Sequence, residues 1–233
     1  MKLRIKFSKH GVMKFIGHLD VMRYFQKAMR RADIDISYTT GFSPHQIMSF
    51  AAPLGVGLES NGEYLDIEAN SVTSSADMTA RLNAVMVDGM HVESVRMLPE
   101  TAGNAMASVA AAKYSIGFAT GKEPSFDLKN AVSAFMSKDT ILVTKQTKKS
   151  EVELDLKPYI YEMTSENGIL TLFVDASSSG NIKPALVMEA LYKENGCELP
   201  EFALQVTRED TYTNIGTEEA PEFVPLEDIG HEF

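Results

Sequence analysis

Basic side chains at regular spacings in the first fifty residues are the clearest sign of chemistry in this sequence. Four fall four, three and one positions apart, so they would project from neighbouring turns of one helix face: Arg23, Lys27, Arg30 and Arg31. Others alternate along the preceding segment or follow it directly: Lys2, Arg4, Lys6, Lys9 and Lys14. Such a cluster is able to bind phosphates through charge and counterion release. The alternative is a solvated basic face that binds nothing.

A loop rich in glycine, proline and hydroxyl side chains comes next, at residues 39–45. It contains the candidate ligand-binding residues Gly41, Phe42, Pro44 and His45. Backbone amides and hydroxyls in such a loop suit an anion, and Phe42 suits stacking on a base. Neither GxxxxGK[ST] nor GxGxxG is present, so this is not a known phosphate-binding motif. As turn chemistry alone, these residues need no ligand.

Histidines in the same region raise the question of acid–base or metal chemistry. His10, His18 and His45 lie there, and only Asp20 is close to His18 along the chain. No HExxH or His-x-His pair is present, so we expect no metal site and no cofactor. His18 or His45 would serve as the general base in RNA cleavage. A hydrogen-bonding or helix-capping role explains His18 more simply.

A second basic feature lies further along the chain. Lys148 is one of several lysines that precede a turn containing Asp155 and Lys157. These three residues are candidates for the same binding surface. The alternative is a β-hairpin with exposed lysines.

The elements that position these residues follow from hydrophobic periodicity. Apolar and basic residues alternate over residues 2–8, which predicts a strand with one buried face. Residues 18–32 space apolar side chains three or four apart, which predicts a helix. Its expected core stripe is Leu19, Met22, Phe25, Met29 and Ala32. The further elements expected up to residue 98 are strands at 35–39, 46–51 and 62–69, a helix from 74 to 89 and a strand at 91–95.

The order β-α-β-β-α-β over residues 1–98 is the ferredoxin-like pattern. Residues 109–208 show a similar order, and the polar segment 99–108 would join the two. We therefore predict an α+β protein built from two tandem ferredoxin-like halves with antiparallel sheets. Residues 209–233 carry eight carboxylates and no lysine or arginine, which predicts an acidic, flexible tail.

Opposite charges at the two ends of the sequence suggest a role for that tail. Residues 1–50 contain nine basic and three acidic side chains. One hypothesis is that the tail transiently covers the basic surface and competes with an anionic ligand. The alternative is a solubilising tail that touches nothing.

Length and composition limit the class of protein. The chain has 233 residues, 44% hydrophobic and 23% charged, which is ordinary for globular proteins and enough for two small domains. A net charge of −10 argues against nucleic-acid binding, but the segregation of charge weakens that objection. No apolar run approaches the roughly 20 residues that span a bilayer, and no signal-peptide pattern is present. We expect a cytoplasmic protein with no membrane partner. The single Cys197 excludes an internal disulfide framework.

Several short motifs occur in a characteristic order along the chain. They are Phe7-Ser8-Lys9, Phe15-Ile16-Gly17-His18-Leu19-Asp20, Arg30-Arg31-Ala32, Gly41-Phe42-Ser43-Pro44-His45, Ser49-Phe50-Ala51, Pro53-Leu54-Gly55, Glu59 and Asp155-Leu156-Lys157-Pro158. In this order they resemble the bacterial radical-SAM-linked domain of unknown function, over about residues 1–208. The resemblance implies a domain that stands alone or is fused behind a cobalamin-binding radical SAM domain, with genes near those of ribosomal proteins and ribonucleases.

This chain lacks the CxxxCxxC cluster of a radical SAM enzyme, so the resemblance implies the stand-alone form, which is not the catalyst. The family has no established activity and supplies no catalytic residues. What the resemblance marks is a candidate binding surface at its motif positions: His18, Asp20, Arg31, Gly41, Phe42, Pro44, His45, Asp155 and Lys157. The predicted duplication also resembles tandem ferredoxin-like CRISPR repeat-processing endoribonucleases, as a fold analogy only. Their glycine-rich motif near the C-terminus has no clear counterpart here.

Three functions follow as hypotheses. The first is a non-catalytic RNA-binding module, or an accessory module for an RNA- or ribosome-related radical SAM enzyme. The second is an enzyme, either a metal-independent endoribonuclease that uses His45 or His18, or a subunit for RNA modification. The third is a protein–protein interaction adaptor. The candidate partners are therefore RNA, a radical SAM enzyme and ribosome-related proteins.

Overall fold

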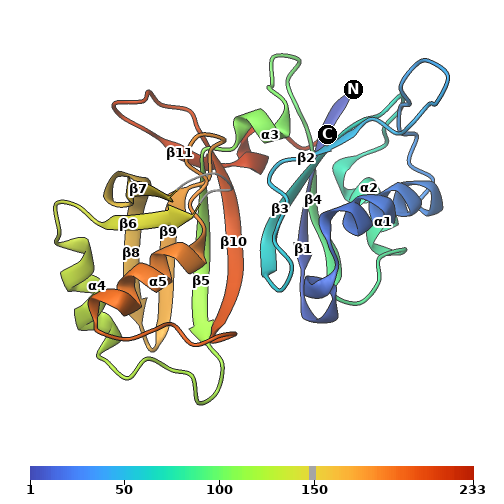
Figure 1. Cartoon of the computed structure of the whole chain (residues 1–233). Coiled ribbons are helices and arrows are strands. Elements are labelled where there is room, and N and C mark those ends of the chain that lie inside the picture. The colour runs from blue at the N-terminus through green and yellow to red at the C-terminus, as the bar shows by residue number, and fades with distance from the viewer. Residues whose placement is uncertain (147–150) are drawn as a thin grey trace. The chain divides into compact units, whose positions relative to one another are not determined.

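The computed structural model of the protein describes residues 1–146 and 151–233 (Figure 1). Over these residues the chain is an α+β protein with five α-helices, a mixed nine-stranded sheet and a two-stranded ladder. It divides into two compact units, Met1–Ala110 with Arg208–Phe233, and Ala111–Thr207. None of the helices in the described ranges combines the length and the apolar character that crossing a bilayer requires.

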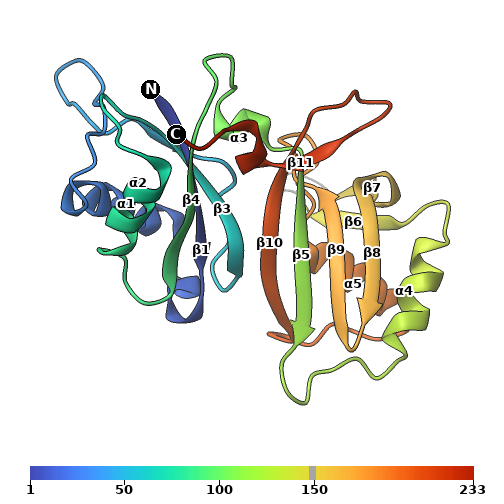
Figure 2. The same cartoon turned by 180° about the vertical axis from the view of Figure 1, so that it is seen from behind.

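The first unit begins with the β-α-β-β-α-β order that the sequence predicts. Its elements are β1 (Lys2–Lys9), η1 (Gly11–Phe15), α1 (His18–Arg31), β2 (Met48–Phe50), β3 (Glu59–Glu68), α2 (Ser75–Asn83), β4 (Met90–Met97), α3 (Ala105–Ser108), the end of β10 (Leu204–Asn214), β11 (Phe223–Pro225) and η3 (Leu226–Ile229). β1 pairs antiparallel with β3 and β4, and β2 pairs antiparallel with β3. Figures 1 and 2 show α1 and α2 on the same side of these strands.

Alternation along β1 places its apolar side chains on the helix-covered face. Leu3, Ile5 and Phe7 are buried and share one core cluster with apolar residues of α1, α2, β3 and β4. Burial of such side chains is the main favourable contribution to folding. The strand predicted at residues 2–8 is confirmed.

The core stripe of α1 differs from the prediction at its start. Phe25 and Met29 are buried as expected, but Leu19 is 59% exposed and Val21 is buried in its place. Val21 precedes Phe25 by four residues, which returns to the same helix face, whereas Leu19 precedes it by six and points elsewhere. The predicted helix is confirmed with this shift of its apolar face.

The strand predicted at 35–39 is wrong. In the described structure this segment forms isolated bridges, Ile36 with Ala69 and Tyr38 with Gln46. The strands predicted at 46–51 and 62–69 are confirmed as β2 and β3, with different bounds.

The second unit packs two helices on one face of its strands. Its elements are β5 (Ala111–Phe118), α4 (Leu128–Met136), β6 (Leu142–Gln146), β7 (Glu151–Asp155), η2 (Lys157–Tyr159), β8 (Ile160–Glu166), β9 (Ile169–Asp175), α5 (Pro184–Glu194) and the start of β10. The strand order is β10-β5-β9-β8, and β6 and β7 form a separate hairpin. α5 lies in front of these strands in Figure 1 and behind them in Figure 2, and α4 lies beside β8 in both views.

The prediction of purely antiparallel sheets is wrong where β10 meets β3. Ser60 Oγ donates to the carbonyl of Arg208 at 3.1 Å, and Asn61 Nδ2 donates to Glu209 at 2.6 Å. These contacts advance in the same direction along both strands, as in a parallel pair. A parallel neighbour needs a long connection, and here the whole second unit lies between β3 and β10 in the sequence.

Residues 209–233 are not a flexible tail. They belong to the first unit, where they form the end of β10, β11 and η3, and His231 bridges to Met97. Leu226 is 0% exposed. Phe223, Val224 and Ile229 are half-buried. The carboxylates of the segment that have basic partners are those of Asp210, Glu227 and Glu232.

Two basic residues of β1, which were expected to face outward, contact this segment. Arg4 is 1% exposed, pairs with Asp66 at 2.7 Å and donates to the carbonyl of Leu226 at 3.0 Å. Lys6 Nζ lies 2.7 Å from Asp210 and 2.6 Å from Glu227. The attraction between the acidic segment and the basic strand therefore exists, as permanent contacts of the fold.

Leu226→Ala should lower the free energy of unfolding by about 2–5 kcal/mol, because it removes a fully buried side chain and leaves a cavity. Ile215→Ala, at an exposed position of the same segment, should change it by less than about 0.5 kcal/mol. Urea denaturation followed by circular dichroism measures both. Small and equal effects would mean that this segment is not packed against the first unit.

Candidate nucleic-acid interface

The outer face of α1 carries the four basic side chains predicted from the sequence, and all four are exposed. They are Arg23, Lys27, Arg30 and Arg31. Arg23 pairs with Asp20 at 3.1 Å, and Arg30 Nε donates to the carbonyl of Gln26 at 3.3 Å. Exposed pairs of this kind contribute little to stability. The cations therefore stay available to a ligand.

A narrow loop follows α1 and projects away from the strands of the first unit (Figure 1). Its base is closed by backbone contacts: Thr39 N donates to the His45 carbonyl at 2.9 Å, and His45 N donates to Thr39 Oγ1 at 3.1 Å. Gly41 has a φ of +116°, a conformation that favours glycine. Gly41, Phe42 and Pro44 are exposed at the tip. The whole Phe42 ring faces solvent, with a relative exposure of 111%.

Gln46 fastens the base of this loop to α1. Its buried side chain donates through Nε2 to the carbonyl of Gln26 at 3.3 Å and to the hydroxyl of Tyr38 at 3.4 Å. These bonds hold the loop beside the helix that carries the cations. We call the exposed residues of the two elements the α1–loop surface: Arg23, Lys27, Arg30, Arg31, Gly41, Phe42 and Pro44.

The two histidines considered as catalytic bases have structural neighbours. His45 Nδ1 lies 3.1 Å from Thr39 Oγ1, so its ring helps to close the loop. His18 is the first residue of α1, and its ring packs edge-on against Phe50 with centroids 5.0 Å apart. In the part of the chain that the structure describes, no group of three or more His, Cys, Asp or Glu side chains is arranged to hold a metal ion.

Lys9 is not the surface cation that the sequence predicts. It is the last residue of β1 and is 2% exposed. It lines a narrow pit together with His18 and Glu63. Burial lowers the pKa of Lys9; the nearby Glu63 carboxylate acts to raise it, and the Arg208 guanidinium lowers it further. The net result is a pKa below the ordinary value of the group.

An ion pair that sequence analysis missed lies beside Lys9. Arg208 donates through Nε to Glu63 Oε1 at 2.8 Å and through Nη2 to the same carboxylate at 2.5 Å, and both side chains are buried. The two residues are 145 positions apart. No local spacing could reveal them as partners. The parallel contact of β10 with β3 brings them together.

Asp155 and Lys157 lie in the second unit and hold a turn there. Asp155 Oδ1 accepts hydrogen bonds from the N–H of Ile141 at 2.7 Å and of Lys157 at 3.0 Å. Lys157 Nζ donates to the carbonyl of Met136. These contacts give both residues a structural role within that unit. Lys148, the third candidate of this part of the chain, lies outside the described residues.

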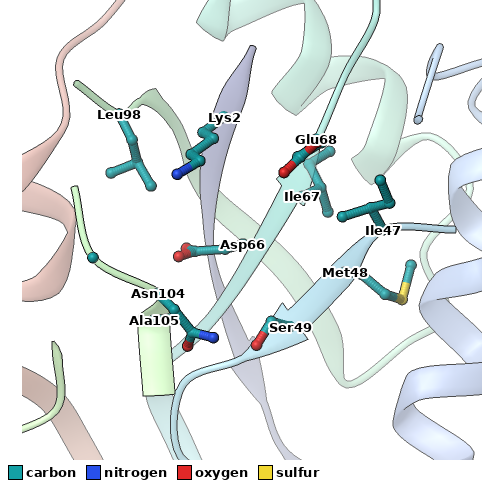
Figure 3. Close-up of a pocket in the computed structure, with 11 residues that line it drawn as sticks. Lys2, Ile47, Met48, Ser49, Asp66, Ile67, Glu68, Leu98, Asn104 and Ala105 are labelled. Atoms are coloured by element: carbon teal, nitrogen blue, oxygen red, sulfur yellow. The ribbon is translucent and has the colours of Figure 1, made fainter. Parts of the chain in front are cut away.

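A separate pocket of about 210 Å³ in the first unit was also not identified from the sequence (Figure 3). Figure 3 shows the polar ends of Lys2, Asp66 and Glu68 pointing toward the side where Leu98 lies. Asp66 is already engaged, because Arg4 donates to its two carboxylate oxygens at 2.7 and 2.9 Å. The pocket shares no residue with the α1–loop surface.

The family model of an uncharacterised protein conserved in bacteria, DUF2344, matches residues 2–184. The chain belongs to this family. The matched range of this DUF2344 protein includes Lys9, the α1–loop surface, Asp155 and Lys157. No curated protein is similar enough in sequence to match it.

Among solved structures, the DUF2344 chain is similar to a chain in the crystal structure of a Cbf5–Nop10–Gar1 complex. The TM-score is 0.51 with 7% sequence identity, and the match covers 90% of this chain and 48% of that chain. This chain thus spans about half the length of the chain it matches. At this identity the likeness shows the fold alone.

Lys9→Met should stabilise the DUF2344 protein at pH 7, and the gain should shrink as the pH rises toward 10.5. The reason is that the native pKa of Lys9 lies below its ordinary value of 10.5. The buried ammonium therefore lowers the free energy of unfolding at pH values below its native pKa. This effect disappears as the ammonium loses its proton. Urea denaturation at pH 7 and pH 10 measures the difference. Lys27→Met, at an exposed site, is the control and should show no such trend; an equal trend in both variants would contradict the assignment.

Proposed function

We propose that this DUF2344 protein is a non-catalytic RNA-binding module, and that the α1–loop surface is its binding site. One observation carries the proposal: four exposed cations on one face of α1 lie on the helix to which Gln46 fastens a loop ending in a fully exposed phenylalanine. Proteins that hold single strands combine basic surfaces with aromatic rings on which bases stack. A solvated basic helix alone would not explain a fully exposed aromatic ring at the tip of the loop that Gln46 fastens to it.

The two parts of the surface have different tasks. The arginines and Lys27 neutralise backbone phosphates, an interaction without sequence preference that weakens as salt is added. Phe42 offers a π-face to any base. The rigid base of the loop reduces the entropy lost when a strand binds, because Thr39, His45 and Gln46 already fix its geometry.

The proposal assigns no reaction to the chain. The His45 ring helps to close the loop, and the His18 ring packs on Phe50. These contacts support a structural role for both histidines. If RNA is cleaved during binding and His45→Ala or His18→Ala abolishes the cleavage, the endoribonuclease alternative replaces the proposal. If RNA does not bind at all, a protein–protein adaptor becomes the better description.

An accessory role is the second part of the proposal. The motifs quoted from the sequence resemble a radical-SAM-linked domain, so a radical SAM enzyme that acts on RNA, or a ribosome-related protein, is the partner we propose. The α1–loop surface would then deliver RNA to that partner. Affinity capture from bacterial cells with wild-type protein, compared with the Arg30→Ala, Arg31→Ala double variant, tests whether the partner depends on RNA.

We also propose that both units are ferredoxin-like and arose by duplication. The order β4-β1-β3 with β2 beside β3 in the first unit, and β10-β5-β9-β8 in the second, supports this. In a ferredoxin-like β-α-β-β-α-β unit, the four strands lie side by side in the order fourth, first, third, second. Both units have this order when β6 and β7 are counted as an insertion in the second unit.

The double substitution Arg30→Ala with Arg31→Ala should weaken binding of single-stranded RNA and flatten its salt dependence. The slope of log K against log salt should fall by about 1.4, at about 0.7 for each phosphate that is no longer neutralised. Fluorescence anisotropy with several unrelated RNA sequences at two or more salt concentrations measures this. The matched control is Lys129→Ala with Lys193→Ala, which removes two exposed cations from the second unit. Equal effects in the two double variants would mean that only net charge matters.

Phe42→Ala should weaken RNA binding by about 1–3 kcal/mol if a base stacks on the ring. Its salt slope should stay at the wild-type value, because the substitution removes no charge. The free energy of unfolding should change by less than about 0.5 kcal/mol, since the ring is fully exposed. Exposed Phe202 of the second unit provides the control, Phe202→Ala. A Phe42→Ala variant that binds RNA as tightly as wild type would remove stacking from the proposal.

A further inference from the structure

A narrow pit opens where α1 begins. Lys9, His18, Phe50, Leu54 and Glu63 are among the residues that line it, and its free volume is about 10 Å³. That is room for about one water-sized group. The pit is therefore too small for a whole metabolite, but it admits a single oxygen of a larger ligand whose remainder lies outside.

Lys9 is the basic side chain that lines this pit. It is 2% exposed, yet within the described residues its ammonium makes neither a hydrogen bond nor an ion pair within 4.0 Å. The neighbouring Glu63 carboxylate is occupied by Arg208 through bonds of 2.8 and 2.5 Å. Two cations thus share one carboxylate in a buried setting. An uncompensated buried charge is costly, and an anion would remove that cost.

The start of α1 adds a second source of positive potential. The N–H groups of Asp20 and Val21 donate to the Gly17 carbonyl at 3.0 Å, which leaves those of His18 and Leu19 without a partner within the helix. The N-cap Gly17 provides no side chain to accept from them. The helix dipole makes this end favourable for an anion. The one acidic residue of the first turn, Asp20, is exposed and is paired with Arg23. Glu63, the carboxylate that lines the pit, is engaged by Arg208, and Asp20 lies in solvent, where salt screens its charge.

We propose that this pit binds one oxygen of a phosphate monoester, and that its ligand is the terminal phosphate of an RNA strand. A monoester carries a charge near −2 and sits at a chain end, so it reaches into a pit that a diester flanked by two sugars does not enter. The oxygen meets the Lys9 ammonium, and the other oxygens meet the α1 amides. The rest of the strand then follows the basic face of the same helix, which is about 21 Å long. This inference rests on the proposed function.

The test compares two RNAs of one sequence, labelled at the 3′ end, with either a 5′-phosphate or a 5′-hydroxyl. Wild-type protein should bind the phosphorylated strand about tenfold more tightly, as one charge-assisted hydrogen bond allows. Lys9→Met should bind both strands equally. Lys27→Met, the matched control on the α1–loop surface, should weaken both and keep the ratio. Equal binding of the two strands by wild-type protein would overturn the inference and leave the proposed function in place.

A second measurement uses wild-type protein alone and does not depend on a variant that folds. Exchange of the Lys9 ammonium protons with water, followed by NMR of protein with 15N-labelled lysine, should slow several-fold in the presence of inorganic phosphate or of 5′-phosphorylated RNA, and not with 5′-hydroxyl RNA. Protection by inorganic phosphate without any RNA binding would contradict the proposed function and assign the pit to a free phosphate compound. Absence of protection by either phosphate ligand would overturn the pit as a phosphate site.

Discussion

Buried charge on the face of β1 turned away from α1 and α2 is the constraint on which the first unit depends. β1 lies between β3 and β4, and its cations Arg4 and Lys6 point to that face. Removing cations from water is costly unless each meets carboxylates and further hydrogen-bond acceptors. Asp66 supplies this from β3, while Asp210 and Glu227 come from the C-terminal segment. Loss of either side would leave charges buried without partners, so β1 and the C-terminal segment stabilise each other.

Much of the first unit could be predicted, because hydrophobic periodicity depends on local geometry. The alternation of β1, the stripe through Phe25 and Met29, and the exposure of the α1 cations all follow from it. The errors at the basic face of β1 and at residues 209–233 have a common cause. An alternating strand shows only that its two faces differ. A basic face covered by a distant acidic segment has the same pattern as one in water, so local spacing places Arg4 and Lys6 outside and leaves residues 209–233 free.

The candidate site also has one part that local spacing predicts and one part that depends on long-range contacts. Its exposed half was visible in the sequence, since helical spacing finds Arg30 and Arg31 and turn residues find the loop around Phe42. Its buried half was not. The surroundings of Lys9 depend on Glu63 and Arg208, which meet only because β10 returns to the first unit. Long-range pairing of this kind leaves no trace in local spacing, and one sequence alone gives no covariation to reveal it.

The discontinuity of the first unit has a consequence for how the protein is made. The ribosome releases residues 1–110 before the second unit, yet the first unit also requires residues 208–233, which are synthesised after the second unit. The second unit is continuous in sequence and is able to fold while the rest is still being translated. Until residues 208–233 emerge, Lys6 lacks the carboxylates of Asp210 and Glu227, and the site of Leu226 is unfilled. Of the two units, the first should therefore complete its folding after the second, the reverse of the usual order for domains on the ribosome.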